Sequence, residues 1–305
     1  VAAYMIDKKI GYIKLIRFSR NSLEEMQEAI SKLKKQGMED LIVDLQDNGG
    51  GLLDVCAHIV DEFLDGNKLI VYSEGRRRPR KEYRATRKGD FEKGRLMILI
   101  NENSASASEI FSGSVQDWDR GLVVGRRSFG KGLVQQPIPL SDGGEMRLTI
   151  ARYFTPSGRF IQKPYENGNA DDYRKEKYNR YLTGELHSQD SIDFPDSLKY
   201  ETLLKKRTVY GGGGIMPDVF VPIDTTGINE LFRVMVRNGF FNNFSVGEVN
   251  NNRAYYKNKF SSFDNFRANF YAYFDNELES NFLEFIKKEK EDLEYTVEDY
   301  AECRD

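Results

Sequence analysis

The feature that most constrains the fold is an apolar strand that ends in a run of glycines. Asp40–Leu45 is typical of a short buried strand, and Asn48-Gly-Gly-Gly51 follows it almost directly. Consecutive glycines permit a tight turn and let backbone N–H groups approach a ligand closely. A helical pattern containing Leu53, Ile59 and Phe63 comes next. A strand, a glycine turn and a helix in this order indicate an α/β layer architecture.

The same alternation extends through most of the chain. Strands are predicted at 10–18, 69–72, 96–100, 122–124 and 146–153, and helices at 22–36 and 105–118. Ser22 and Glu25 have the spacing of a capping box at the start of the first helix. Strands that alternate with helices predict a largely parallel sheet.

The last part of the chain has a different character. No proline occurs after Pro222, and apolar residues recur at helical spacing around 228–235, 263–274 and 278–286. Residues 165–207 are polar and charged and are expected to form an insertion. We therefore predict a core domain of residues 1–222 and a mostly helical C-terminal domain of residues 223–305. The sequence leaves open whether that domain docks onto the core, dimerises or binds a partner.

Composition excludes several classes of site. Two cysteines, Cys56 and Cys303, and two histidines, His58 and His187, argue against a disulfide scaffold and a Cys/His zinc site. The net charge of −3 argues against general nucleic-acid binding. No apolar run is long enough for a transmembrane helix, and no signal peptide is expected at Val1.

Three hydroxyls stand among alanines in Asn103-Ser-Ala-Ser-Ala-Ser-Glu109, between a predicted strand and a predicted helix. A helix N-terminus favours negative charge, which suits the oxyanion formed when a serine attacks a carbonyl. Ser106 and Glu109 also have capping-box spacing, so helix capping explains the same residues without catalysis.

A lysine lies between two glycines in Gly125-Arg-Arg-Ser-Phe-Gly-Lys-Gly132. This segment nearly matches a phosphate-binding P-loop, but Gly132 lacks the hydroxyl that binds Mg²⁺. Pro137 and Pro139 also make the required following helix improbable. Lys131 is therefore interpreted either as a surface lysine or as a general base that its surroundings keep neutral. In an extended strand, Lys131 and Gln135 would share a face.

Taken together, these segments resemble C-terminal processing (tail-specific) serine proteases. The resemblance covers roughly residues 10–222. It rests on DLQDNGGGLL at 44–53, NENSASASEIFSG at 101–113, VGRRSFGKGLVQQ at 124–136, RYFTPSGRFIQ at 152–162 and GGIMPDVFVP at 213–222.

The resemblance implies a ClpP/crotonase-like α/β core with a Ser–Lys catalytic dyad. It makes Ser106 the nucleophile and Lys131 the base, with Gln135 holding the lysine. Asp117 matches an acidic position that supports the site in some members.

The resemblance also implies an oxyanion hole made of backbone N–H groups. One would come from Ala107 and the other from the glycine turn, where Gly50 is favoured although the sequence does not separate it from Gly51.

The resemblance further implies that no metal or organic cofactor is needed. Substrates would be proteins or peptides with accessible, apolar C-termini, and the location would be extracytoplasmic, in the periplasm or cell envelope. Family members usually carry a PDZ domain ahead of this core, and none is visible in this sequence, so tail specificity stays open. The oligomeric state is also open.

Two rival functions remain. A Ser–His–Asp hydrolase would need His58 or His187 near Ser106, and the sequence has no Gly-x-Ser-x-Gly elbow. A non-catalytic peptide-binding module would use the same groove with Ser106 only capping a helix.

Two further features are assigned structural roles. The basic run Arg76–Lys81 is expected to form a solvated hairpin tip rather than a nucleic-acid patch. Cys56 is expected to be a small core residue.

Overall fold

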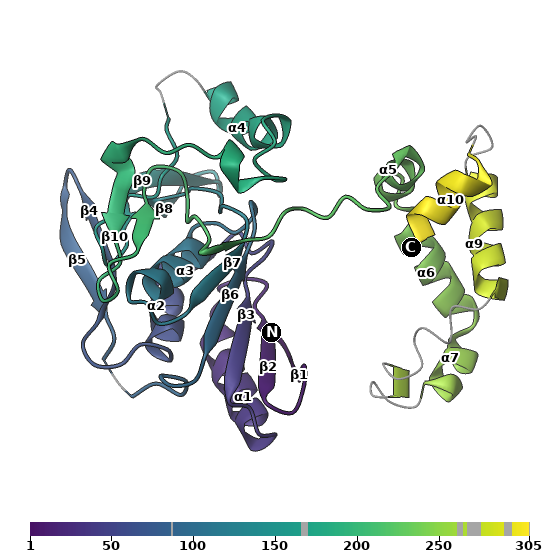
Figure 1. Cartoon of the computed structure of the whole chain (residues 1–305), viewed down its shortest axis with the longest axis horizontal. Coiled ribbons are helices and arrows are strands. Elements are labelled where there is room, and N and C mark those ends of the chain that lie inside the picture. The colour runs from purple at the N-terminus through teal and green to yellow at the C-terminus, as the bar shows by residue number, and fades with distance from the viewer. Residues whose placement is uncertain (87, 166–169, 261–264, 267–275, 290–294, 305) are drawn as a thin grey trace. The chain divides into compact units, whose positions relative to one another are not determined.

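The computed structural model describes residues 1–86, 88–165, 170–260, 265–266, 276–289 and 295–304. The chain divides into two compact units, Val1–Ile223 and Asp224–Asp305. The first combines sheets with helices, and the described part of the second is helical (Figure 1). An α/β core followed by a mostly helical C-terminal part is therefore confirmed.

The first unit is built on a six-stranded sheet in the order β1-β2-β3-β6-β7-β12. Its strands are β1 (Ala2–Met5), β2 (Ile10–Lys14), β3 (Asp40–Asp44), β6 (Leu96–Ile100), β7 (Leu122–Gly125) and β12 (Val219–Phe220). β1 runs antiparallel to β2, and every other neighbouring pair is parallel. The largely parallel sheet expected from the alternation of strands and helices is confirmed.

Three helices lie in the chain between β2 and β7: α1 (Ser22–Lys35), α2 (Leu53–Asp61) and α3 (Ala107–Asp117). They share one hydrophobic core with the sheet, in which Met26 of α1, Ile59 of α2 and Phe111 of α3 are fully buried with Val43 and Ile98. In Figure 1, α2 and α3 lie on one side of β6 and β7. This packing fixes the N-terminus of α3 against the ends of the parallel strands.

A second, antiparallel sheet has the order β5-β4-β9-β8. Its strands are β4 (Leu69–Gly75), β5 (Arg78–Arg84), β8 (Leu133–Pro139) and β9 (Glu145–Phe154). Sequence patterns predicted β4 and β9, and the expected hairpin around Arg76–Lys81 implied a strand in the place of β5 without giving its bounds. The edge strand β8 was not predicted. β8 accommodates Pro137 and Pro139 because an edge strand does not need every N–H group.

The polar insertion contains regular structure. Helix α4 (Ala170–Leu182) is followed by two short 3₁₀ turns, Gln189–Ser191 and Asp196–Leu198, and by a hairpin of β10 (Lys199–Glu201) and β11 (Thr208–Tyr210). The insertion therefore folds as part of the first unit.

The described helices of the second unit are α5 (Glu230–Arg237), α6 (Phe240–Asn251), α7 (Arg253–Lys259), α9 (Asn276–Glu289) and α10 (Val297–Arg304). Leu231, Met235, Phe240, Phe282 and Ile286 form its apolar core. The helices predicted at 228–235 and 278–286 are confirmed, whereas the one at 263–274 falls almost entirely outside the described residues. Within the described ranges, no helix is both long and apolar enough to cross a membrane.

Candidate active site

A groove of about 750 Å³ brings four of the predicted residues together: Gly50, Ser106, Lys131 and Gln135. Ser106 and Lys131 are each half-buried, so solvent and ligands can reach them. Lys131 precedes β8 rather than belonging to it, and a bulge separates Val134 from Gln135. Lys131 and Gln135 therefore line the same groove, but not as two residues of one regular strand, which is how the sequence predicted it.

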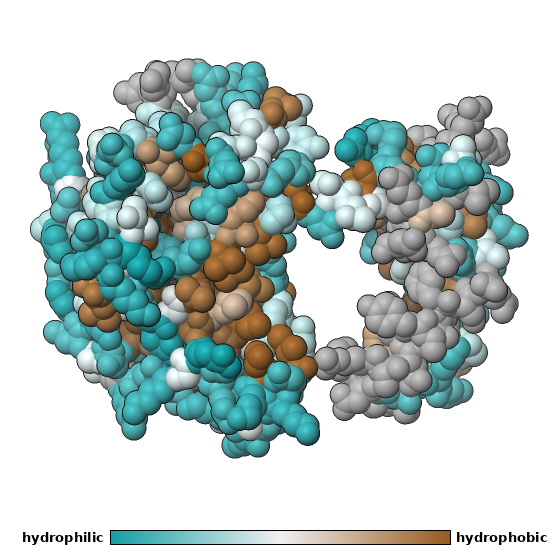
Figure 2. All heavy atoms as spheres, in the orientation of Figure 1, coloured by the Kyte–Doolittle hydropathy of each residue, from teal (hydrophilic) through white to brown (hydrophobic). Residues whose placement is uncertain are grey.

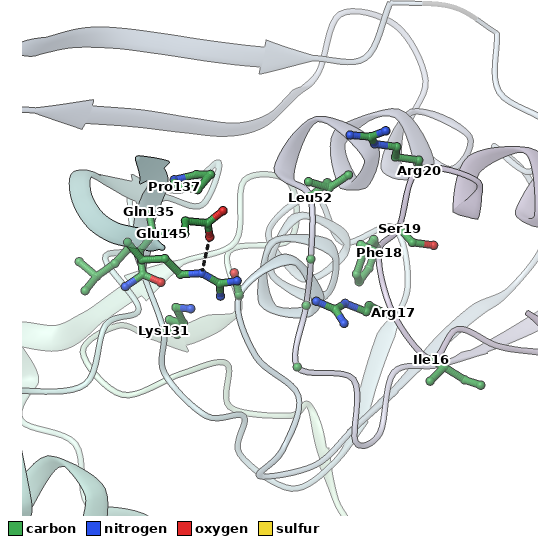
Figure 3. Close-up of a pocket in the computed structure, with 16 residues that line it drawn as sticks. Ile16, Arg17, Phe18, Ser19, Arg20, Leu52, Lys131, Gln135, Pro137 and Glu145 are labelled. Atoms are coloured by element: carbon green, nitrogen blue, oxygen red, sulfur yellow. Dashed lines mark hydrogen bonds and ion pairs between the residues drawn. The ribbon is translucent and has the colours of Figure 1, made fainter. Parts of the chain in front are cut away.

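The two walls of the groove come from different parts of the chain (Figure 3). Lys131, Gln135 and Pro137 lie on one side, whereas Arg17 and Leu52 lie on the other. The second wall consists of residues 16–20 and the glycine turn.

The predicted strand 10–18 ends earlier than expected, because the chain leaves the sheet after Lys14 to pair with the glycine turn. The N–H of Phe18 donates to the carbonyl oxygen of Gly50 at 3.1 Å, and the N–H of Leu52 donates to that of Phe18 at 2.9 Å. Ser22 does not cap α1 as predicted, since Asn21 is the N-cap and the Ser22 hydroxyl donates to the Arg17 carbonyl at 2.9 Å. Ser22 therefore anchors this wall of the groove.

Ser106 is the N-cap of α3 and has an unusual backbone conformation, with φ 57° and ψ −112°. A non-glycine residue held there stores roughly 1–3 kcal/mol of strain, and such residues cluster at functional sites. The conformation is held by buried Asn48, whose carbonyl oxygen accepts from the N–H of Ala105 at 3.0 Å and from the Ser108 hydroxyl at 2.8 Å.

The glycine turn packs against the start of α3. A Cβ atom on Gly50 would lie 2.8 Å from the Ser106 Cβ and 2.9 Å from the Ala107 nitrogen, so only glycine fits there. Ala107 is the first residue of α3, and its N–H therefore has no acceptor within the helix.

Gly50 and Gly51 differ in whether their N–H groups are engaged. The N–H of Gly50 donates to Asn48 Oδ1 at 2.9 Å. Gly51 and Phe18 form a parallel β-bridge, in which Phe18 is hydrogen-bonded to the two neighbours of Gly51. The N–H of Gly51 therefore points away from Phe18. Among the described residues, none accepts a hydrogen bond from the N–H of Gly51. The N–H of Gly50, the glycine that was favoured, is thus engaged within the turn, whereas that of Gly51 is not.

Buried Glu109 links the two segments that carry Ser106 and Lys131. Its Oε2 accepts from the backbone N–H of Ser106 and that of Lys131, each at 2.8 Å. Its Oε1 accepts from the N–H of Gly130 at 2.6 Å and from the Ser128 hydroxyl at 2.5 Å. Burial raises the pKa of Glu109, and these donors oppose the rise. The sequence indicated Glu109 only as a capping-box residue.

Tyr153 makes a second link between the same two segments. Its hydroxyl contacts the carbonyl oxygen of Ser106 at 3.1 Å and also that of Lys131. The side chain is fully buried, which raises the pKa of the phenol well above its ordinary value, so the hydroxyl stays protonated and can donate. The sequence indicated Tyr153 only as a strand residue within a family motif.

The insertion supports the loop that precedes Lys131. The Arg180 guanidinium donates to the carbonyl oxygens of Ser128 at 2.7 Å and Phe129 at 3.2 Å. Arg180 is itself buried and ion-paired with Glu176 at 2.6 Å. Helix α4 thus fixes the position of this loop from the side of the insertion.

Asp117 lies apart from the groove, at the far end of α3. Eleven helical residues span roughly 15 Å from Ala107 to Asp117. The Asp117 carboxylate pairs with the Arg159 guanidinium and accepts from the N–H of Ser157 at 2.8 Å. Both members of the pair are completely buried, which is the setting of a structural ion pair.

The two histidines do not line the groove. His58 is exposed on α2, and His187 is exposed in the insertion. The segment Gly125–Gly132 leads into strand β8 and not into a helix, so the P-loop interpretation stays rejected. Cys56 is fully buried, as predicted, and donates to the Ala107 carbonyl at 3.1 Å.

A smaller pocket of about 140 Å³ opens beside Ser106. Its apolar lining includes Leu53, Ile110, Leu133 and Val134. A space of this size and character accommodates an aliphatic side chain.

A family model and curated relatives that match this chain point to the same family of peptidases. The model of peptidase family S41 matches residues 9–174. The carboxy-terminal-processing protease of Bartonella bacilliformis is 40% identical over 164 residues, covering 52% of this chain and 38% of the relative. The chloroplastic C-terminal processing peptidase of Tetradesmus obliquus is 36% identical over 156 residues, covering 51% of this chain and 33% of the relative.

A solved structure is also similar. The photosystem II D1 C-terminal processing protease matches with a TM-score of 0.45 and 37% identity, covering 49% of this chain and 38% of that one. The matched region thus spans less than two fifths of the length of each of these relatives.

Proposed function

This chain belongs to peptidase family S41, and from that premise we propose that it is a serine endopeptidase with a Ser106–Lys131 dyad. The observation that carries the proposal is the strained N-cap conformation of Ser106, in a groove that Lys131 and Gln135 also line. Helix capping alone does not require a strained residue at the edge of a groove.

The proposed reaction begins with proton transfer. The neutral Lys131 amine takes the proton of Ser106 Oγ as the oxygen attacks the peptide carbonyl carbon. The tetrahedral intermediate collapses when Lys131 returns that proton to the leaving amine. Water, deprotonated by Lys131, then attacks the acyl-enzyme, and Lys131 passes that proton to the departing Ser106 Oγ. Gln135 is proposed to orient the lysine, and Glu109 and Tyr153 are proposed to position the backbone of both residues.

The oxyanion would be held by the N–H of Ala107 and a second N–H from the glycine turn. Gly50, the glycine favoured by the family resemblance, would first have to release Asn48 Oδ1. We therefore propose Gly51 as the second donor.

The apolar pocket beside Ser106 supports cleavage after an aliphatic residue. The names of the relatives support a preference for C-terminal tails, and this preference is proposed here for the present chain. An extracytoplasmic location is part of the same proposal and follows from the family resemblance.

The deciding experiment measures cleavage of an unfolded protein by wild type, Ser106→Ala, Lys131→Ala and Lys131→Arg between pH 6 and pH 10. Wild-type activity should rise with pH, because only the neutral form of an amine base can accept the proton of a serine hydroxyl. Removing the base should lower kcat/KM by about 10²- to 10⁴-fold. Lys131→Arg should be inactive too, because a guanidinium stays protonated.

Ser31→Ala and Lys35→Ala are matched controls on the exposed face of α1 and should behave as wild type. Full activity of Lys131→Ala would eliminate the dyad. Binding without cleavage by wild type would favour the peptide-binding module. Loss of activity in His58→Ala or His187→Ala would favour a Ser–His–Asp hydrolase.

A further inference from the structure

The basic run Arg76–Lys81 is only partly a hairpin tip. Arg76 and Arg77 form the turn, while the remainder begins strand β5. Together with Arg152 of β9 and Glu74 of β4, Arg76, Arg78 and Arg80 line a hollow of about 760 Å³ on the second sheet. We call this feature the basic hollow. Four arginines and one glutamate thus line it, and a further carboxylate, that of Glu82, pairs with Arg80.

Edge protection does not account for the whole cluster. Charged side chains on an edge strand discourage pairing with other molecules, which is a sufficient reason for Arg78 and Arg80 on β5. Arg152, however, lies on β9, between β4 and β8 in the sheet. There it is the cross-strand partner of Glu74, and its guanidinium carbon lies 5.0 Å from the centre of the Phe160 ring.

Two of the arginines are held in place by the protein. The Arg80 guanidinium carbon lies 3.7 Å from the centre of the Tyr72 ring, and its Nη2 pairs with Glu82 Oε1 at 2.8 Å. Arg78 Nη2 donates to Gln136 Oε1 at 3.1 Å. The other two, Arg76 and Arg152, are exposed and have no carboxylate partner among the described residues. The hollow thus combines ordered guanidinium groups with unpaired positive charge.

The positive charge is local and adjoins the groove. The whole chain carries a net charge of −3, so the cluster does not reflect a basic protein. Leu133 lines both the basic hollow and the groove that contains Ser106. In Figure 2, the left-hand edge of the first unit, where β4 and β5 lie in Figure 1, is hydrophilic.

We propose that the basic hollow is an exosite for an acidic segment of the polypeptide substrate, engaged while a neighbouring segment lies at Ser106. This inference rests on the proposed peptidase function. Guanidinium groups bind carboxylates through directed, charge-assisted hydrogen bonds.

A polypeptide fits the hollow better than a nucleic acid does. Single-stranded nucleic acids need open aromatic faces on which bases stack. Here the Tyr72 ring already lies between the Arg80 guanidinium and the Phe154 ring, whose centroid is 4.9 Å away.

The primary test measures binding, so that it does not depend on catalysis. Three labelled 16-residue peptides share an Ala/Val-rich segment and carry four glutamates at the N-terminal end, four at the C-terminal end, or four glutamines. Their affinities for full-length Ser106→Ala are measured by fluorescence anisotropy in 50 and 500 mM NaCl. One glutamate peptide should bind about 5- to 30-fold more tightly than the glutamine peptide in low salt, the factor expected from two exposed ion pairs. The difference should shrink in high salt.

Arg76→Gln/Arg152→Gln, added to Ser106→Ala, should remove most of this preference. The matched control Lys32→Gln/Lys35→Gln removes the same charge from the exposed face of α1 and should retain it. Thermal melting checks that both variants stay folded. Equal affinity for all three peptides, or an equal loss in both double variants, would overturn the exosite. Preferential binding of a single-stranded 12-mer DNA to the hollow would overturn it as well.

Measuring cleavage of the same peptides by the chain with Ser106 intact distinguishes a failure of the exosite from a failure of the proposed peptidase function. If no peptide is cleaved but the glutamate preference in binding depends on Arg76 and Arg152, the basic hollow stands and the peptidase function fails. If all three peptides are cleaved with equal kcat/KM and bound equally, the function stands and the exosite fails.

Discussion

Glu109→Gln tests how Ser106 and Lys131 are held in one site. The carboxylate accepts four hydrogen bonds: Oε2 takes the N–H groups of Ser106 and Lys131, and Oε1 takes the N–H of Gly130 and the Ser128 hydroxyl. Glutamine has almost the same shape, but it replaces one acceptor oxygen by an NH₂ donor. One pair of donors must therefore face another donor.

The cost depends on which way the amide turns. With its nitrogen toward Ser106 and Lys131, two buried N–H groups lose their acceptor. With its nitrogen toward Gly130 and Ser128, the Ser128 oxygen can accept from the amide as well as from the N–H of Ile215. The N–H of Gly130 is then stranded, and the rotatable Ser128 hydroxyl must direct its hydrogen to another acceptor. A stranded buried donor costs about 1–3 kcal/mol. The second orientation is cheaper, and we expect the free energy of unfolding to fall by about 1–3 kcal/mol.

Urea unfolding followed by circular dichroism measures this loss, and cleavage of a quenched peptide measures its effect on the site. The variant should remain folded, with kcat reduced more strongly than KM is raised, because the anchor common to Ser106 and Lys131 is altered. Glu28→Gln, an exposed change on α1, is the matched control. A Glu109→Gln protein within about 0.5 kcal/mol of wild type, the range of ordinary surface changes, would refute the reasoning.

Three further predictions follow from local geometry. Ser106→Gly should be more stable to urea than Ser106→Ala by up to about 2 kcal/mol, since glycine tolerates φ 57° without strain and this outweighs its greater chain entropy; an alanine variant of equal or higher stability would show that the conformation is not strained. Asp117→Ala should lose about 3–5 kcal/mol in the same assay because it strands the buried Arg159 guanidinium, and an unchanged midpoint would contradict the structural ion pair. In a Cys303→Ser background, Cys56 should not react with a thiol reagent at pH 8 until urea unfolds the chain, because burial raises the pKa of its thiol; labelling of the native protein would show that the thiol is accessible.

The parts of the fold that could be predicted are those whose signal is local. Asp40–Leu45 is apolar and ends in glycines, so β3 and its turn are visible in the sequence. The edge strands of the second sheet were harder to predict. The bounds of β5 were not predicted, because its many arginines hide the alternation of a strand. β8 was missed because its two prolines usually argue against a strand.

In the candidate site, too, the residues with a local sequence signal were predicted and the others were not. Ser106 and Lys131 were identified from family motifs, each within its own segment. Glu109 and Tyr153 were not assigned a role in the site, because their contacts join segments that are separate in the chain and no periodicity reports such contacts. The engaged N–H of Gly50 was equally invisible, since it depends on where the Asn48 side chain points.

The two prolines of β8 also affect how molecules of this protein can meet. An unpaired sheet edge is a template on which strands of other molecules can assemble. Pro137 and Pro139 have no N–H to offer along that edge, so an incoming strand finds no donor at these two positions near the hairpin end. Only the stretch nearer to Lys131 keeps donors. The protein can thus leave one strand of its groove uncovered while limiting the tendency to polymerise through it.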